Sequence, residues 1–138
     1  MRIPATCLDV SLPATTASVG RARRSVGEAA VEAGASGAVL DDIKLCVSEA
    51  VANAALHAYG DEPGSVHVVV ELEGFDLDVV VSDNGTGIVY GGGRSGGGRG
   101  LIIISKLASR HSVMSARGGG TEVRMTFRLD SPSGQPSG

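Results

Sequence analysis

A long amphipathic pattern lies near the middle of the chain, where apolar residues recur every three or four positions, as on one face of an α-helix. The residues that form this stripe are Ile43, Cys46, Val47, Ala50 and Ala54. At about 100° per residue, Glu49 and Asn53 fall at the edge of the stripe, one helical turn apart. Polar groups there are costly without a partner, so a bound ligand or metal is one explanation and ordinary edge-of-core polarity is the other.

The remaining chain alternates between patterns of period two, which predict strands, and patterns of helical period. A glycine at 34 ends the first helical pattern, and Glu73–Gly74 begins a tight reversal between two strands. The predicted strands are 7–12, 65–72, 76–83, 111–117 and 121–129, and the predicted helices are 14–33, 36–59 and 101–110.

The segment 101–110 allows two interpretations. Its run of leucine and isoleucine has strand propensity. Yet Leu101, Ile104 and Leu107 follow a helical period, and Lys106 suits the last turn of a helix. We therefore predict a helix, whose start would place the backbone N–H groups of Gly98, Arg99 and Gly100 at an anion-binding position.

Two polar side chains are predicted to point into the core. Continuing the alternation of residues 77–81 puts Asp83 on the buried face of its strand, and the same parity puts Thr121 on the buried face of the last strand. A buried carboxylate needs a partner. Asp83 is followed by Gly85 and Gly87, so a tight turn is the plain alternative to a binding site.

Composition excludes several classes of protein. The 138 residues fit one domain, 1–130, with a disordered tail over 131–138, and the net charge of −3 with no Trp argues against a nucleic-acid partner. Cys7 and Cys46 stand apart, which suggests buried thiols in a reducing compartment. Without a signal-peptide pattern or a long apolar run, we expect a cytoplasmic protein with no membrane contact.

Four short motifs occur in a characteristic order along the chain: Glu-x-x-x-Asn at 49–53, Asp-x-Gly-x-Gly at 83–87, Gly-x-Gly-Leu at 98–101 and Gly-Thr at 120–121. This order resembles the nucleotide-binding boxes of the GHKL ATPase superfamily. Within this superfamily, the chain resembles most closely the bacterial anti-sigma factor serine/threonine kinases. The resemblance to their first box is carried by Ser48, Glu49, Asn53 and the segment 57–59. The resemblance covers about residues 5–130.

The resemblance implies an α+β fold, a two-layer sandwich in which three helices cover one face of a mixed, mostly antiparallel sheet. ATP and Mg²⁺ would bind between the layers. Asn53 would hold Mg²⁺ and Glu49 would be the general base. Asp83 would accept the adenine amino group, supported by Thr121. The remaining nucleotide contacts would come from Gly85, Gly87, Gly98, Arg99, Gly100 and Leu101.

The resemblance also implies a function. The chain would phosphorylate a small anti-anti-sigma antagonist on serine or threonine, and it would sequester a sigma factor. It would form a homodimer, and Arg23 on the first helix would contact a protein partner.

Two alternatives remain open. The segment between Gly87 and Gly100, the lid over the nucleotide in such proteins, is short and nearly all glycine, whereas family lids are commonly longer. An ATP-binding partner-switching module without efficient phosphoryl transfer is therefore the second hypothesis. A hydrolase or sensor-kinase catalytic domain is the third.

Overall fold

The computed structural model describes residues 3–57, 64–84, 97–115 and 120–129. Two long helices follow an opening strand, and a third helix separates two β-hairpins. The strands are β1 (Ala5–Pro13), β2 (Ser65–Glu73), β3 (Asp76–Asp83), β4 (Arg110–Ser115) and β5 (Thr121–Arg128). The helices are α1 (Ala17–Ala33), α2 (Gly37–His57) and α3 (Gly97–Leu107).

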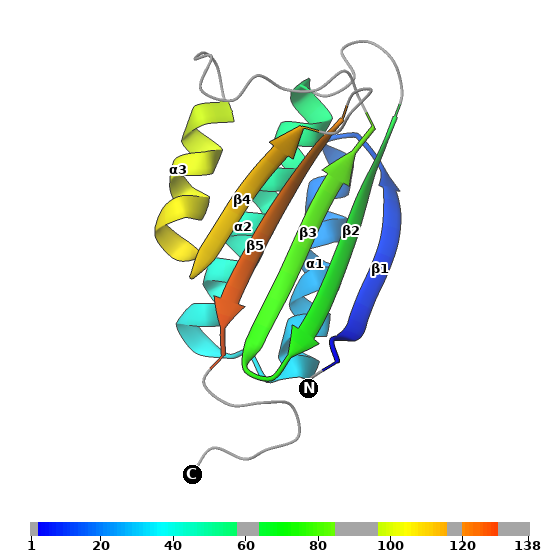
Figure 1. The fold of residues 1–138 in the computed structure, drawn as a ribbon. Helices are drawn as coiled ribbons and strands as arrows, with labels where there is room; N and C mark the ends of the chain where they lie inside the picture. Colours follow the sequence, from blue (N-terminus) through cyan, green and yellow to red (C-terminus); the bar gives the residue numbers. More distant parts are fainter. Residues whose placement is uncertain (1–2, 58–63, 85–96, 116–119, 130–138) are drawn as a thin grey trace.

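The strands form one five-stranded sheet in the order β1-β2-β3-β5-β4, and the three helices cover one of its faces (Figure 1). This confirms the predicted two-layer α+β sandwich. All four strand pairs among the described residues are antiparallel, so the parallel component of the predicted mixed sheet is not found there. The sheet alternates buried and outward residues, as expected when only one face is covered.

The β2–β3 hairpin closes through a two-residue loop, Gly74–Phe75, between the paired residues Glu73 and Asp76. Gly74 has φ of +64°, a conformation that residues with a Cβ adopt at a cost. The predicted reversal is therefore confirmed, and it sets the register that carries β3 as far as Asp83.

Helix α1 ends as its sequence predicts. Gly34 is left-handed, with φ of +113°, and its N–H group bonds to the carbonyl oxygens of Ala30 and Val31. Thr16 occupies the N-cap position but its side chain forms no capping bond. The first turn is instead held by backbone N–H groups of Ser18 and Val19, which donate to the carbonyls of residues 15 and 16.

The predicted helix after the glycine-rich segment is confirmed as α3, although it begins four residues earlier than expected, at Gly97. Glycine is a poor helix former, so the local sequence favours a later start. Burial of Ile104, with Leu101 and Leu107 packed against the core, stabilises this face of the helix.

The core lies between the helices and the sheet, and valines from β2 and β3 line its sheet side. Cys46 is completely buried in it, as predicted, whereas Cys7 is exposed and the prediction of a buried thiol there was wrong. Cys7 lies on edge strand β1 at an irregularity in its pairing with β2, between Thr6 and Leu8, and its side chain is exposed there. The largest fully buried side chains are Phe127, Ile43, Leu77, Ile104, Met125 and Leu129.

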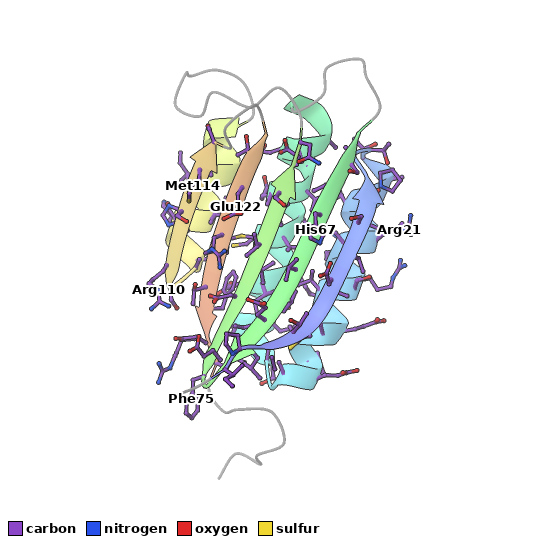
Figure 2. The ribbon with its side chains drawn as sticks, turned by 45° about the vertical axis from the view of Figure 1, so that its right-hand side comes forward. Arg21, His67, Phe75, Arg110, Met114 and Glu122 are labelled. Carbon is purple, nitrogen blue, oxygen red and sulfur yellow. The ribbon has the colours of Figure 1, made fainter. Side chains whose placement is uncertain are left out.

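The sheet face away from the helices carries polar side chains from every strand, among them His67 and Glu122 (Figure 2). The His67 imidazole contacts the Asp9 carboxylate at 2.6 Å, and the Thr126 hydroxyl donates to Asp78. No helix within the described residues is long and apolar enough to cross a membrane.

Candidate functional site

Glu49 and Asn53 lie on α2 where its C-terminal half meets the start of α3. A Cβ added to Gly100 would be 3.1 Å from Asn53 Nδ2 and 3.3 Å from Glu49 Oε1. The backbone of α3 therefore rests directly on both side chains. Asn53 is 5 % exposed and Glu49 is half-buried, so the structure brings together two residues from the first motif and one from the third.

The Asn53 side chain includes a buried polar atom that is unsatisfied among the described residues. Its Nδ2 atom is buried and has no hydrogen-bond partner among the described residues. Leaving a buried amide donor unpaired costs about 1–3 kcal/mol. Buried polar groups of this kind mark places where a ligand, ion or water completes the structure.

The first turn of α3 supplies backbone donors beside this amide. The first four N–H groups of an α-helix have no partner within the helix, and here that turn is Gly97 to Gly100. An anion bound at this helix N-terminus would therefore contact the backbone N–H groups of Gly98 and Arg99. Leu101 is the fifth residue, where intrahelical bonding begins, and its side chain packs against the core.

Asp83 and Thr121 form a second buried polar pair. They stand opposite each other in the β3–β5 register, with exposures of 8 % and 2 %. The predicted inward direction of both side chains is confirmed. Each of the two residues has an interaction within the protein.

Gly120 allows β5 to approach the end of β3. Its φ is +97°, and an added Cβ would lie 2.4 Å from the Asp83 carbonyl oxygen and 3.3 Å from Asn84 Cα. Sequence reasoning gave this residue no role, although the Gly-Thr motif contained it. Only the pairing of β3 with β5 shows why a side chain is excluded there.

Both polar clusters lie at one end of the sandwich. The C-terminal end of α2, the start of α3, the end of β3 and the start of β5 all meet there (Figure 1). Helix α2 also contacts β3 and β5 directly. Gly85 and Gly87 fall outside the described residues, as does the side chain of Arg99.

The residues present fit a magnesium nucleotide. The Asn53 amide offers an oxygen for a hard cation and a nitrogen that can donate to a phosphate oxygen, and its nitrogen lacks a protein partner among the described residues. Within that same set of residues no group of three His, Cys, Asp or Glu side chains could hold a metal ion. A cation here would therefore take most of its ligands from phosphate and water, as Mg²⁺ commonly does.

Comparison with known proteins agrees with this geometry. The family model described as "Histidine kinase-like ATPase domain" matches residues 12–127. The chain belongs to this family. The match includes α2, the β3–β5 pair and α3, which together carry both polar clusters.

The names of the curated relatives are more specific than the description of the family. The chain is 39 % identical over 80 residues to the serine-protein kinase RsbW of Listeria innocua, covering 57 % of this chain and 51 % of the relative. It is 38 % identical over 103 residues to the anti-sigma F factor of Pasteuria penetrans, covering 65 % of this chain and 69 % of the relative. The chain thus spans about half the length of the Listeria kinases it matches.

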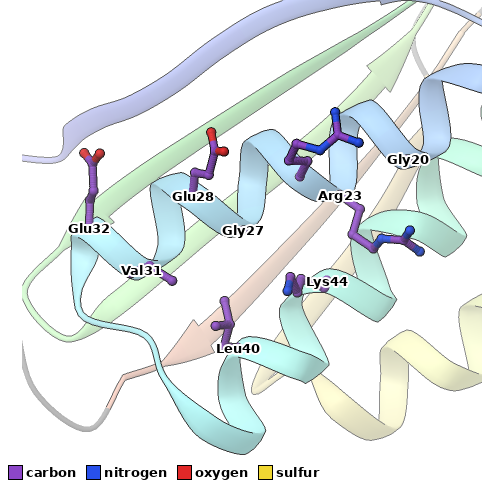
Figure 3. Close-up of a pocket in the computed structure, with 9 residues that line it drawn as sticks. Gly20, Arg23, Gly27, Glu28, Val31, Glu32, Leu40 and Lys44 are labelled. Carbon is purple, nitrogen blue, oxygen red and sulfur yellow. The ribbon is translucent and has the colours of Figure 1, made fainter.

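Arg23 lies apart from this site. It is exposed on α1 and lines a groove between α1 and α2, together with Lys44 and Leu40 (Figure 3). Helix α2 separates this groove from α3, since α1 packs on one side of α2 and α3 on the other (Figure 1). The predicted partner residue is therefore not part of the candidate nucleotide site.

Proposed function

We propose that this protein is an ATP-dependent serine/threonine kinase of the anti-sigma factor type, which phosphorylates an anti-anti-sigma antagonist and sequesters a sigma factor. The observation that carries this proposal is the contact of α3 with Glu49 and Asn53, which places a carboxylate and an unpaired buried amide beneath a helix N-terminus. The names of the similar proteins support the same activity.

Glu49 is the general base of the proposed reaction. Its half-buried carboxylate lies one helical turn from Asn53 and beside Gly100. An antagonist hydroxyl that approaches the phosphates held at this turn would donate its proton to a Glu49 oxygen as its oxygen bonds to the γ-phosphorus. The bond between the γ-phosphorus and the bridging oxygen of ATP would break in the same step, and ADP would leave.

Asn53 and the first turn of α3 hold the phosphates. The Asn53 oxygen would be the protein ligand of Mg²⁺, and the N–H groups of Gly98 and Arg99 would bond to phosphate oxygens. The bound cation would neutralise charge on the transferring phosphoryl group. Gly100 leaves room for the backbone to come this close, because even one methyl group would crowd both side chains.

Asp83 and Thr121 recognise the base in this proposal. A carboxylate is an acceptor only, so Asp83 suits the exocyclic amino group of adenine and not the carbonyl oxygen of guanine. The Thr121 hydroxyl can donate to Asp83 or to the ring. Because the pair is buried and opposed across two strands, the acceptor is fixed in direction.

Three further expectations belong to this proposal. The protein would work in the cytoplasm, Arg23 would contact a protein partner, and the chain would form a homodimer. The homodimer expectation comes from the family resemblance, and light scattering that gave a monomer mass at all concentrations would contradict it.

The alternative is a partner-switching module that binds ATP without efficient transfer. The short glycine-rich lid is the feature that favours it. Glu49 and Asn53 are both present and adjacent, which favours the kinase.

One experiment separates the two functions. The purified protein is mixed with Mg-ATP labelled at the γ-phosphate and with candidate antagonist proteins from the same organism. We expect labelled phosphoserine or phosphothreonine on one antagonist, and ATP binding at roughly micromolar Kd. ATP binding without label on any antagonist supports the module, and absence of ATP binding up to millimolar nucleotide rejects both.

A further inference from the structure

A small hollow lies between β4 and β5, on the sheet face that the helices leave uncovered. Its volume is about 220 Å³, and we call it the β4–β5 hollow. The strand register places Arg110 opposite Thr126 and Ser112 opposite Arg124, and all four residues line the hollow. His111 is the fifth lining residue, although strand alternation directs its side chain to the opposite face. Because the helices cover that opposite face, the candidate nucleotide site does not use the hollow (Figure 2).

The hollow includes a buried hydroxyl group. Thr126 is only 5 % exposed although it lies on the uncovered face of the sheet, and its hydroxyl donates a hydrogen bond to Asp78 on β3. This bond fixes the Thr126 side chain and uses its one donor. The hydroxyl of Ser112, which is exposed on β4, can donate to an anion in the hollow.

The two arginines of the hollow form long ion pairs with nearby carboxylates. Arg110 Nη2 lies 3.7 Å from Asp76 Oδ2, and Arg124 Nη2 lies 3.6 Å from Glu122 Oε2. Both distances exceed the roughly 2.7–2.9 Å of a charge-assisted hydrogen bond. The arginine side chains are 69 % and 47 % exposed, and exposed ion pairs of this kind contribute little. Both guanidinium groups can therefore donate to an anion without first breaking a hydrogen bond to these carboxylates.

Acidic residues surround the hollow, but among the described residues none lines it. The carboxylates that contact its lining residues are those of Asp76, Asp78 and Glu122. Arg128 also lies 3.7 Å from Asp76, so three arginines balance three acids over this part of the sheet. A balanced patch produces little long-range attraction for anions. Recognition there would depend on direct contact with the arginines of the hollow, whose planar groups match the oxygens of a phosphate.

We propose that the β4–β5 hollow binds a phosphate dianion, either inorganic phosphate or the phosphoryl group of a small monoester. The guanidinium groups of Arg110 and Arg124 match its two negative charges, and the Ser112 hydroxyl adds a further donor. The hollow has room for about seven waters at about 30 Å³ each, and it is smaller than the roughly 300–1,000 Å³ pockets that enclose larger ligands. A phosphate group with bound water fits this size. The inference does not depend on the proposed function.

The test is a titration of the full chain with sodium phosphate at constant ionic strength and pH 7.5, followed by the amide signals in NMR spectra. We expect the amides of Ser112 and Arg124 to shift most, with a Kd of about 1 mM. Free phosphoserine is titrated in parallel. Equal affinities would identify the phosphoryl group as the feature that is bound, and binding of inorganic phosphate alone would identify the free ion. Sodium acetate, a monoanion, should shift the same amides much less.

Substitutions of the arginines separate local contact from net charge. Arg110→Ser and Arg124→Ser each remove one guanidinium group of the hollow and should weaken phosphate binding by about tenfold. Arg128→Ser is the matched control, because Arg128 lies on the same strand as Arg124 but lies over the Phe75 ring, 5.1 Å from its centroid, and does not line the hollow. It should bind phosphate within about twofold of the parent. Arg124→Lys keeps the charge but loses the planar group, so it should bind more weakly than the parent.

Three results would overturn the inference. Phosphate at about ten times the expected Kd could shift no amide of β4 or β5. Arg124→Ser and Arg128→Ser could weaken binding equally, which would reflect net charge alone. Phosphate could also shift only amides at the start of α3, which would place the anion in the candidate nucleotide site. An Asn53→Ala variant checks this last case, since it changes that site and should leave the shifts of β4 and β5 as they are in the parent.

Discussion

The backbone of Gly100 lies against the side chain of Asn53, so close that a Cβ on Gly100 would stand 3.1 Å from Asn53 Nδ2. This contact joins the start of α3 to the polar edge of α2. The Asn53 amide nitrogen at this contact is buried and has no hydrogen-bond partner among the described residues.

Replacing Gly100 with alanine tests this contact. Alanine is a better helix former than glycine, and this gain offsets part of the crowding that the added methyl group causes. The added methyl group must displace Asn53 or Glu49, and we expect ATP affinity to fall several-fold. Gly20→Ala is the control, because a Cβ there meets nothing within 4 Å, and it should leave ATP binding unchanged. Equal ATP affinity in the two variants, measured by calorimetry, would contradict the assigned contact.

Gly120→Ala should destabilise the protein. The residue combines a positive φ with an added Cβ at 2.4 Å from the Asp83 carbonyl oxygen, so strain and overlap act together. We expect a loss of about 2–4 kcal/mol in the free energy of unfolding. Gly37→Ala separates the two causes, since Gly37 has φ of +57° but open space, and it should cost only about 1 kcal/mol. Urea unfolding of both variants makes the comparison.

Asp83→Asn should reduce the preference for adenine. The amide replaces an oxygen acceptor by a group that can also donate, so the contact with the exocyclic amino group weakens. We expect ATP affinity to fall by about tenfold, the worth of one hydrogen bond to a charged group, with little change for GTP. Competition between the two nucleotides supplies the control within one protein, and an unchanged ratio would remove Asp83 from the base contact.

Because the Cys46 thiol is buried, we expect the stability of the folded protein to depend on pH in the alkaline range. Burial, with smaller effects of Asp42 and Glu49, raises the pKa of Cys46 from 9.0 to about 12. The folded state therefore keeps a proton that the unfolded state loses above pH 9, and this contribution to stability declines as pH rises from 9 toward 12. A Cys46→Ala variant should show a smaller decline than the parent over pH 8–11 in urea unfolding. If the free energy of unfolding fell equally with pH in the parent and in Cys46→Ala, the assignment of this effect to Cys46 would be wrong.

Period-two alternation was sufficient to predict the direction of Asp83 and Thr121, because both strands are covered on one face only. The helical stripe likewise located Glu49 and Asn53. Neither pattern could reveal the approach of Gly120 to Asp83. That contact depends on β5 pairing with β3, which are separated in the chain by α3 and β4, and such long-range pairing has no local signal.

The groove between α1 and α2 was not predictable either. The arginines of α1 indicated a solvated face or a partner-binding patch but no groove, and the sequence assigned no role to Lys44. Their meeting depends on how α1 packs against α2 over Gly27, where a missing side chain admits the lysine stem. The start of α3 at Gly97 has a similar origin, since packing of Ile104 outweighs the low helix propensity of the glycines before it.

The central claim is that Glu49 is the base of a phosphoryl transfer whose nucleotide is held by Asn53 and α3. The most direct measurement is single-turnover transfer from labelled Mg-ATP to the antagonist, together with ATP affinity, for the parent, Glu49→Ala and Asn53→Ala. Glu49→Ala should keep ATP affinity and lose transfer by about 10²–10⁴-fold, the usual contribution of a positioned general base. Asn53→Ala should lose both together, because it removes the protein ligand of the metal. Transfer by Glu49→Ala at the rate of the parent would contradict the account.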